Sequence, residues 1–416
     1  MKIKVYHIFL IFSILALAWT TVHAGSFYNF RGLGEIRYFS NAQAIGMGGN
    51  LIAVPDRFQI NVVNPAGLVF IPLTRLSGDF LHEAIWNKTI LGNGFVKYTN
   101  LNGISLAIPL IENRLVTSIS IIPISQFDYD YSISDSIDHY NSTTKFEYMK
   151  KIKANGGLNK ISFGFGLAIT KHIYLGSYFH YNFGKLEQTW MVDYVSDLFW
   201  DSSDRLTRKM WGVSWSGGLI VHPSANLYLG TIYSGKYKLT IHDQADNNTQ
   251  KGGYIYEVDN VENEAEKISV PEYWGIGMTY VLKEKYRLSS DFIYQSWSNF
   301  KEKNNLITDY HDSYRFGIGI EMLPNTNMLA KYYEKMTYRA GYFYRQLDFQ
   351  DESGNNVTEY GISIGAGFPY YGTWGRIDIA LRYGKRGDLS LNPVEEKIFQ
   401  VFISVTGGEK WFRRGN

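Results

Sequence analysis

The feature that most constrains the fold is a period of two in hydrophobicity, which recurs along most of the chain. It is clear in 160–169 (KISFGFGLAI), 286–294 (YRLSSDFIY) and 376–384 (RIDIALRYG), where apolar residues alternate with polar or small ones. A strand, whose successive side chains point to opposite faces, produces this pattern. After the N-terminal leader no stretch approaches the ~18 consecutive apolar residues of a membrane-spanning helix. The pattern favours a wall of strands that is apolar outside and polar or small inside.

Short and long connections alternate between these strand-like segments. The segments are 74–83, 92–110, 115–125, 158–169, 172–184, 210–221, 226–241, 268–282, 285–297, 311–322, 336–347, 357–369, 376–386 and 397–406. The short connections include 112–114, 170–172, 222–226 and 283–285, and the long polar ones are 126–157, 185–209, 242–267 and 298–310. A soluble β-sandwich also alternates, but tight turns and extended loops in alternation are typical of outer-membrane barrels.

We therefore predict an all-β fold, a transmembrane antiparallel β-barrel of about 14 strands. A split of 92–110 at 100–103 would give 15, which breaks the up-and-down parity, so we keep that segment as one irregular strand. The predicted barrel spans 73–407. It is preceded by a signal peptide at 1–24 and an N-terminal hatch or plug at 25–72, and it is followed by a basic tail at 408–416.

The leader, MKIKVYHIFLIFSILALAWTTVHA, combines Lys2 and Lys4 with an apolar core and small residues before position 25. This order is typical of a secretory signal peptide, and the apolar run is short for the alternative, a membrane anchor. An exported barrel belongs in the bacterial outer membrane. The chain contains no Cys, which excludes disulfides, thiolate metal sites and lipid attachment to a cysteine.

Composition argues against several classes of function. Charged residues make up 19% of the chain and the formal net charge is +2, so there is no electrostatic reason to expect a nucleic-acid partner. The nine His residues form no recognisable constellation with Ser and a carboxylate, and the Gly-rich GMGG lacks the Lys and Ser/Thr of a phosphate-binding loop. We predict no enzyme, no catalytic residues, no metal site and no cofactor. A barrel-borne hydrolase with a triad at the outer rim remains a distant alternative.

The region from 25 to 72 does not alternate. Gly46, Gly48 and Gly49 permit tight turns and close backbone approach, while Pro55 and Pro65 exclude a regular strand interior. Its apolar residues require burial. We predict that this segment folds back into the lumen as a plug.

The order of motifs resembles the FadL/TodX-type family of outer-membrane transporters of hydrophobic compounds. The matching stretches are Ala44 to Leu68 (AIGMGGNLIAVPDRFQINVVNPAGL), Val270 to Phe300, Tyr338 to Arg345 (YRAGYFYR) and Ile377 to Gly387 (IDIALRYGKRG). The resemblance implies that Asn64, Pro65 and Ala66 belong to an N-terminal hatch. A plain turn in which Asn64 caps backbone groups is the simpler interpretation.

The chain departs from that family at its end, where VTGGEKWFRRGN continues beyond the last strand. This ending resembles PorV-like relatives, in which the fold serves protein secretion. The resemblance thus leaves two functions open. One is passive, hatch-gated uptake of a hydrophobic small molecule, such as a long-chain fatty acid or hydrocarbon, with lateral exit into outer-membrane lipid. The other is a scaffold or shuttle that binds a secretion-system partner protein.

Lateral exit requires a strand whose hydrogen-bond ladder is interrupted, and proline lacks the donor N–H. Pro109 and Pro123 are the candidate interruptions, with simple strand ends as the alternative. Ile293 and Phe402 are apolar on otherwise polar inner faces, so they are candidates for a ligand pocket or for contact with the plug. Uptake predicts an apolar pocket between hatch and wall and a hole in the barrel side, whereas a scaffold predicts a sealed wall and large ordered external loops.

Overall fold

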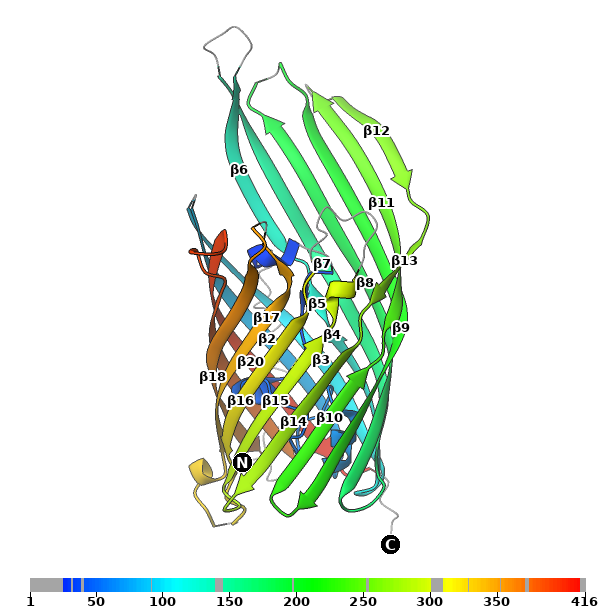
Figure 1. Cartoon of the computed structure of the whole chain (residues 1–416), viewed down its shortest axis with the longest axis vertical. Coiled ribbons are helices and arrows are strands. Elements are labelled where there is room, and N and C mark those ends of the chain that lie inside the picture. Colours follow the sequence, from blue (N-terminus) through cyan, green and yellow to red (C-terminus); the bar gives the residue numbers. More distant parts are fainter. Residues whose placement is uncertain are drawn as a thin grey trace.

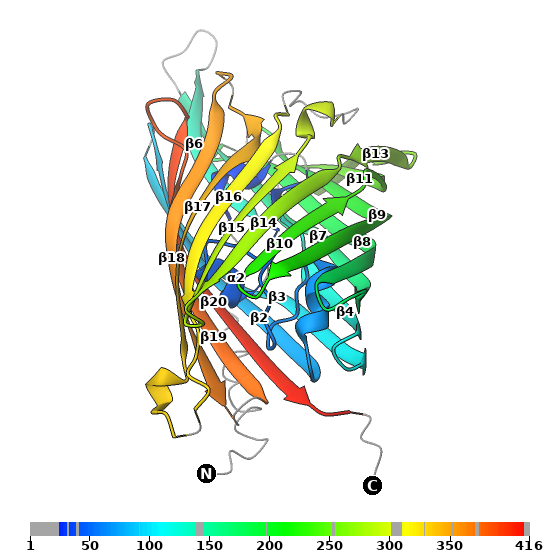
Figure 2. The same ribbon diagram turned by 60° about the horizontal axis from the view of Figure 1, so that its bottom comes forward.

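The computed structural model describes residues 25–30, 33–38, 41–90, 92–138, 145–196, 198–251, 254–300, 310–327, 329–351, 353–370 and 374–411. The predicted signal peptide and residues 412–416 of the predicted tail lie outside this part of the chain. The described residues form a closed antiparallel β-barrel, with the N-terminal segment (25–73) inside it (Figure 1, Figure 2). Within this part of the chain, no helix has the length and apolar character needed to cross a membrane.

The barrel confirms the predicted strand count. Its strands are β2 (Thr74–Thr89), β3 (Asn93–Ile111), β4 (Leu115–Pro123), β6 (Tyr129–Asp138), β7 (Lys145–Ala168), β8 (Ile173–Tyr194), β9 (Asp201–Ser224), β10 (Leu227–Ser234), β11 (Tyr237–Lys251), β12 (Tyr254–Glu262), β13 (Glu266–Val270), β14 (Tyr273–Leu282), β15 (Tyr286–Gln295), β16 (Ser313–Met322), β17 (Thr337–Gln350), β18 (Asn356–Tyr370), β19 (Gly375–Arg386) and β20 (Val394–Glu409). Counting β4 with β6, β10 with β11, and β12 to β14 each as one bent strand gives 14. The barrel closes where β20 pairs with β2, and β20 ends two residues beyond the predicted boundary at 407.

The two faces of the wall differ as the alternation predicts. On β8 and β9 the outward side chains of Phe179, Val213 and Trp215 are exposed, while the inward side chains of Asn182 and Ser216 are buried. An outer apolar belt around a polar or small-residue interior is the arrangement required of a barrel in lipid. The predicted single irregular strand at 92–110 is also present, as β3, with a register shift opposite Asp79 and Phe80.

The prediction of long loops at 126–157, 185–209 and 242–267 is wrong, because much of each range is strand. β7 and β9 contain 24 residues each, whereas β15 and β16 contain 10. Since a strand rises about 3.3 Å per residue and about 10 residues cross a bilayer, the long strands continue far beyond the membrane. We call 129–138, 145–154, 187–194, 201–208, 242–251 and 254–262 the extracellular sheet, which rises above the rest of the barrel in Figure 1.

The N-terminal segment contains four short elements: η1 (Phe27–Phe30), β1 (Glu35–Ile36), α2 (Ala42–Gly46) and η2 (Pro65–Phe70). The side chain of Asn41 caps α2 by accepting a hydrogen bond from the N–H of Ala44 at 2.8 Å. α2 contacts the inner faces of β17 to β20, and η2 contacts β4, β7, β8 and β9. The segment therefore bridges opposite sides of the lumen (Figure 2).

Candidate functional site

The GMGG motif lies directly against the wall. Gly46 is the last residue of α2, and Gly48 and Gly49 follow it with φ of 71° and 82°, a conformation that favours glycine. The Arg315 guanidinium donates hydrogen bonds to the carbonyl oxygens of Gly48 at 2.6 Å and Gly49 at 3.0 Å. A Cβ on Gly341 of β17 would lie 2.0 Å from the backbone nitrogen of Gly48. The backbones of wall and segment thus touch, because neither carries a side chain there.

The Asn-Pro-Ala motif makes a similar contact on the other side of the lumen. Asn64 caps η2, since its side chain accepts a hydrogen bond from the N–H of Ala66 at 3.0 Å and donates one to the carbonyl oxygen of Ile52 at 2.7 Å. A Cβ on Gly176 of β8 would lie 2.4 Å from the carbonyl carbon of Pro65. The motif therefore forms a local turn in which Asn64 caps backbone groups, and it also packs on the wall.

Buried ion pairs join the N-terminal segment to the wall. Glu35 accepts hydrogen bonds from Arg345 and from Arg386, the latter at 2.6 Å. Both arginines also reach Glu359, at 2.7 and 2.8 Å, and Arg386 reaches Glu396 at 3.3 Å. Burial disfavours the charged form of Glu35, but the guanidinium groups of Arg386 and Arg345 outweigh it and hold its pKa below the ordinary value. Glu35 is therefore ionised and fixed to the wall at neutral pH.

A second network holds the segment nearer the periplasmic end. Arg376 of β19 contacts Asp56 of the N-terminal segment at 3.2 Å and Asp378 at 2.7 Å. Arg339 of β17 joins Asp378 at 2.6 Å and Glu321 at 2.7 Å. Burial would raise the pKa of Asp56, but the Arg376 charge keeps it well below its usual range. Removing one partner from such a buried cluster leaves an uncompensated charge, so the cluster resists movement of the segment.

The candidate pocket residues line small internal cavities in the described part of the chain. Ile293 borders a space of about 20 Å³ beside Tyr38 and Trp297. Phe402 borders a space of about 40 Å³ beside Arg37 and Tyr38. A water molecule needs about 10–15 Å³ of such space, whereas drug-sized ligands occupy pockets of ~300 Å³ or more. Both side chains also pack in clusters that include the N-terminal segment, as the alternative for these residues predicts.

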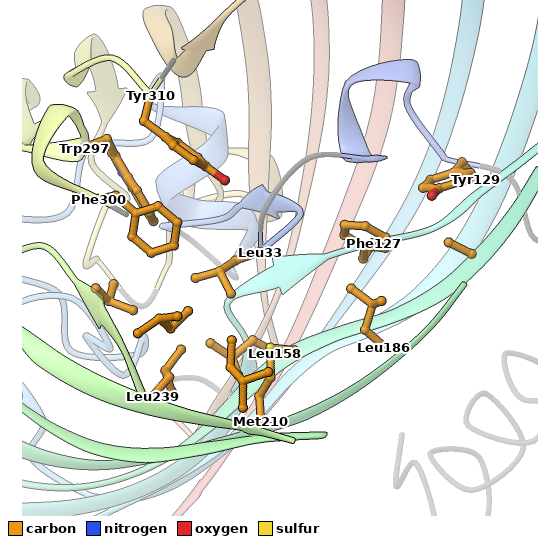
Figure 3. Packing of buried hydrophobic residues seen from close by; sticks show 14 residues of the cluster. Leu33, Phe127, Tyr129, Leu158, Leu186, Met210, Leu239, Trp297, Phe300 and Tyr310 are labelled. Carbon is orange, nitrogen blue, oxygen red and sulfur yellow. The ribbon is translucent and has the colours of Figure 1, made fainter. Parts of the chain in front are cut away.

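A buried apolar cluster closes the extracellular end of the lumen. Figure 3 shows Leu33 of the N-terminal segment between two groups of side chains. On one side lie Trp297, Phe300 and Tyr310, and on the other lie Leu158, Met210 and Leu239 of the wall, with Phe127, Tyr129 and Leu186 farther along. The Trp297 and Phe300 ring centroids are 5.2 Å apart. The cluster is filled by its own side chains.

The wall is broken on one side. Among the described residues β3 pairs with β4 from Ile104 to Ile111, and the ladder of its outer part, 93–103, is with β2. β4 ends at Pro123, after which the chain turns inward and β5 (Ser125–Gln126) pairs with β1 of the N-terminal segment. Pro123 therefore stands where the break begins. Pro109 does not, because it lies opposite Val116 within the β3–β4 ladder.

Glycines that we did not single out in the sequence complete the break. A Cβ on Gly157 of β7 would lie 2.3 Å from the carbonyl oxygen of Ser125, so its absence lets the inward turn pack on β7. Gly103 of β3 lies at the point where β3 and β4 separate. A cavity of about 720 Å³ opens there. Its lining includes Arg37 of the N-terminal segment, so it reaches from the outer surface to the segment inside the barrel.

The enzyme alternative gains no support from the lumenal histidine. His180 lies between the hydroxyl groups of Ser162, at 2.7 Å, and Ser216, at 2.9 Å, with no carboxylate in contact. Across the described ranges no three His, Asp or Glu side chains are grouped so that they could hold a metal ion.

A closed barrel of 14 strands with an apolar outer belt defines this protein as an outer-membrane β-barrel of the FadL-like fold. It superposes on a Pseudomonas aeruginosa FadL homologue (TM-score 0.61, 14% identity, 90% of this chain and 99% of that chain) and on the P. putida toluene transporter TodX (0.60, 15%, 90% and 100%). It is also similar to the CymD monoaromatic hydrocarbon channel (0.59, 15%, 90% and 98%). The model of the BamG family matches residues 1–416, so the chain belongs to the BamG family. No curated protein matches the sequence.

Proposed function

We propose that this barrel is a membrane-embedded docking component of the Bam complex and that its lumen conducts no solute. The observation that carries this proposal is a combination: the N-terminal segment is ion-paired to the wall, and an ordered sheet rises above the membrane. The family name, BamG, associates the chain with the Bam complex. Extended strands beyond the bilayer provide surface for a partner.

The extracellular sheet offers two kinds of binding surface. In the described residues β6 pairs along β7 and β12 along β11, so the far edge of each strand carries unpaired backbone groups. Free edges of this kind accept a strand from another protein. Ile133, Ile137 and Trp190 lie on the inner face of the sheet and are 53%, 41% and 36% exposed. Exposed apolar side chains on an ordered face mark an interaction surface.

The test is to trim the sheet without altering the barrel. Removing 132–151 and 247–259, with an Asn-Gly turn in place of each, preserves register because both deletions begin and end on paired residues. We expect the tagged protein, purified from its own outer membrane, to retain Bam subunits at least tenfold less than the intact chain. The control deletes 326–333 from the connection between β16 and β17 at the opposite end of the barrel. Retention of the subunits by the trimmed protein would exclude the docking role.

A second candidate function, passage of a hydrophobic small molecule, is favoured by the break in the wall. Met210 belongs to the apolar cluster at the extracellular mouth and also lines the cavity at the break. A molecule that displaced the apolar cluster would therefore be separated from the cavity at the break, and so from the membrane, by the side chains that the cluster and the cavity share. The names of similar structures point to toluene and monoaromatic hydrocarbons, and a long-chain fatty acid is a further substrate class. In this role Gly46, Gly48, Gly49, Asn64, Pro65 and Ala66 are hatch residues.

A disulfide between the segment and the wall separates the two functions. The Asn50 amide lies 3.2 Å from the Ser289 hydroxyl of β15, and the chain has no native Cys. If a moving hatch gates uptake, Asn50→Cys with Ser289→Cys is expected to lower uptake of a labelled long-chain fatty acid by at least tenfold when oxidised, with recovery under reductant. Ser289→Cys alone is the control. Equal uptake in the oxidised and reduced states would contradict hatch gating, and the docking role predicts unchanged Bam retention in both states.

A further inference from the structure

The cavity at the wall break lies at the outer edge of the membrane. On β8 the outward side chains change from apolar at Phe179 and Tyr181 to charged at Lys185, and on β9 they change from Val213 and Trp211 to charged at Lys209. The short turns lie at the opposite end of these strands, so this change marks the extracellular interface. Aromatic and basic side chains are typical of the depth at which lipid headgroups lie.

Two lysines lie side by side at the rim of the cavity. Lys185 and Lys209 are direct partners in the β8–β9 ladder, and both are exposed and line the cavity. Side chains of such partners lie about 5 Å apart at Cβ, and like charges there repel. Lys185 contacts Glu187 at 2.6 Å, while Lys209 has no ion-pair partner among the residues that the structure describes. The pair thus presents excess positive charge toward the cavity.

The other charged groups of the cavity already have hydrogen-bond or ion-pair partners. Asp128 accepts hydrogen bonds from the Gln126 amide at 2.7 Å and from the N–H of Gly156 at 3.1 Å. Arg37, at the inner end, is hydrogen-bonded to Tyr98 and lies 3.8 Å from Glu83. An anion that enters the cavity therefore meets the Lys209 ammonium group, which has no ion-pair partner among the described residues, beside the Lys185 ammonium group, which Glu187 engages, while the Asp128 carboxylate is held by hydrogen bonds.

Aromatic side chains extend from the lysines toward the membrane. Phe183 is the ladder partner of Trp211, and its ring stacks on that of Tyr181 with centroids 5.9 Å apart. All three line the cavity. A ligand that fits this surface carries a negative group at one end and an apolar body at the other. We propose that the cavity binds the phosphate-bearing headgroup of an outer-leaflet lipid, with the phosphate between Lys185 and Lys209 and an acyl chain along the three rings.

Binding of short-chain phosphatidylglycerol to the full-length protein in detergent, measured by native mass spectrometry, tests this proposal. Two charge-assisted contacts are at stake, so Lys185→Gln with Lys209→Gln is expected to weaken binding at least tenfold. Lys151→Gln with Lys153→Gln, on the outer face of β7 and outside the cavity, removes the same charge and is expected to change binding less than twofold. Trp211→Ala tests the apolar contact and is expected to weaken lipid binding severalfold.

Two comparisons decide the source of the phosphate. Phosphatidylcholine is expected to bind at least tenfold more weakly than phosphatidylglycerol, and inorganic phosphate at millimolar concentration is expected not to displace the lipid. Displacement by inorganic phosphate would overturn the lipid in favour of a free anion. Equal binding of the two lipids would overturn the preference for a net negative headgroup, and equal losses in the two double variants would overturn the site itself.

Discussion

Arg386→Met is expected to lower the free energy of unfolding by about 3–5 kcal/mol, the largest effect of any single substitution considered, because it leaves buried carboxylates without their cation. Arg386 contacts Glu35 of the N-terminal segment as well as Glu359 and Glu396 of the wall, and its side chain is 2% exposed. Urea unfolding of the refolded protein in lipid vesicles measures the loss. Protease accessibility of the region from 25 to 72 shows whether the segment has left the wall.

Lys385→Met is the matched control, one residue earlier on the same strand. Lys385 makes its ion pairs with Asp388 and Glu395 at a more exposed site, where such pairs contribute about 0–1 kcal/mol. We expect it to leave protease protection unchanged. If the two substitutions lowered stability equally, the buried network would not be what fixes the segment, and the argument for a closed lumen would lose its main support.

The barrel was predictable because its strands obey one rule along their membrane part. Lipid outside and a packed lumen inside force a period of two, as in 376–384, and every predicted segment coincides with part of a strand. The same rule explains the error in the long connections. Beyond the membrane the outer face no longer meets lipid, so Lys151 and Lys153 of β7 follow no hydrophobic alternation although they are in a strand. Polar strands and polar loops then look alike in sequence.

The interior of the lumen was only partly predictable. Burial of the N-terminal segment followed from its glycines and apolar residues, and Pro123 was a candidate interruption. The ion networks did not follow, because Arg386 and Glu35 are 351 positions apart and pair only once the barrel closes. The sequence did carry a sign of these networks, because Arg376, Asp378 and Arg386 fall on the inward face of their strand. In a water-filled lumen such charges could remain solvated, whereas in a packed lumen they must pair. The break itself depends on the separation of β3 from β4, which single-strand periodicity cannot show.

The structure also changes how the two candidate functions compare. Uptake predicts a hole in the wall and an apolar pocket, whereas a scaffold predicts a sealed wall and large ordered external loops. The wall has a hole, the candidate pocket residues line small cavities, and the external part is an ordered sheet, so each set of expectations is met only in part. The cavities beside the two candidate pocket residues bear on the uptake role. Spaces of about 20 and 40 Å³ beside Ile293 and Phe402 leave no room for a fatty acid at these two positions, so binding there requires the segment or the apolar cluster to move. The strength of the contact between segment and wall therefore bears on both functions.

That contact is tested most directly at the glycines of the wall. Gly341→Ala is expected to prevent the GMGG motif from seating, because the new Cβ would lie 2.0 Å from the backbone nitrogen of Gly48. Gly176→Ala is expected to do the same to the Asn-Pro-Ala motif, 2.4 Å from the carbonyl carbon of Pro65. Forcing backbone apart in a packed interior costs about 1–3 kcal/mol, so each variant should fold as a barrel but expose the segment to protease and lose that much stability.

Gly217→Ala separates this effect from a general intolerance of side chains in the wall. Gly217 is the ladder partner of Ser177 on β8, and its new Cβ would meet Trp215 at 3.7 Å and the Gly176 oxygen at 3.8 Å, which are ordinary contacts. We expect Gly217→Ala to change neither stability nor protection by a measurable amount. If Gly341→Ala and Gly176→Ala behaved like this control, the segment would have room to shift inside the barrel. A segment that shifts so easily could act as a gate, and uptake would then become the better explanation of the break in the wall.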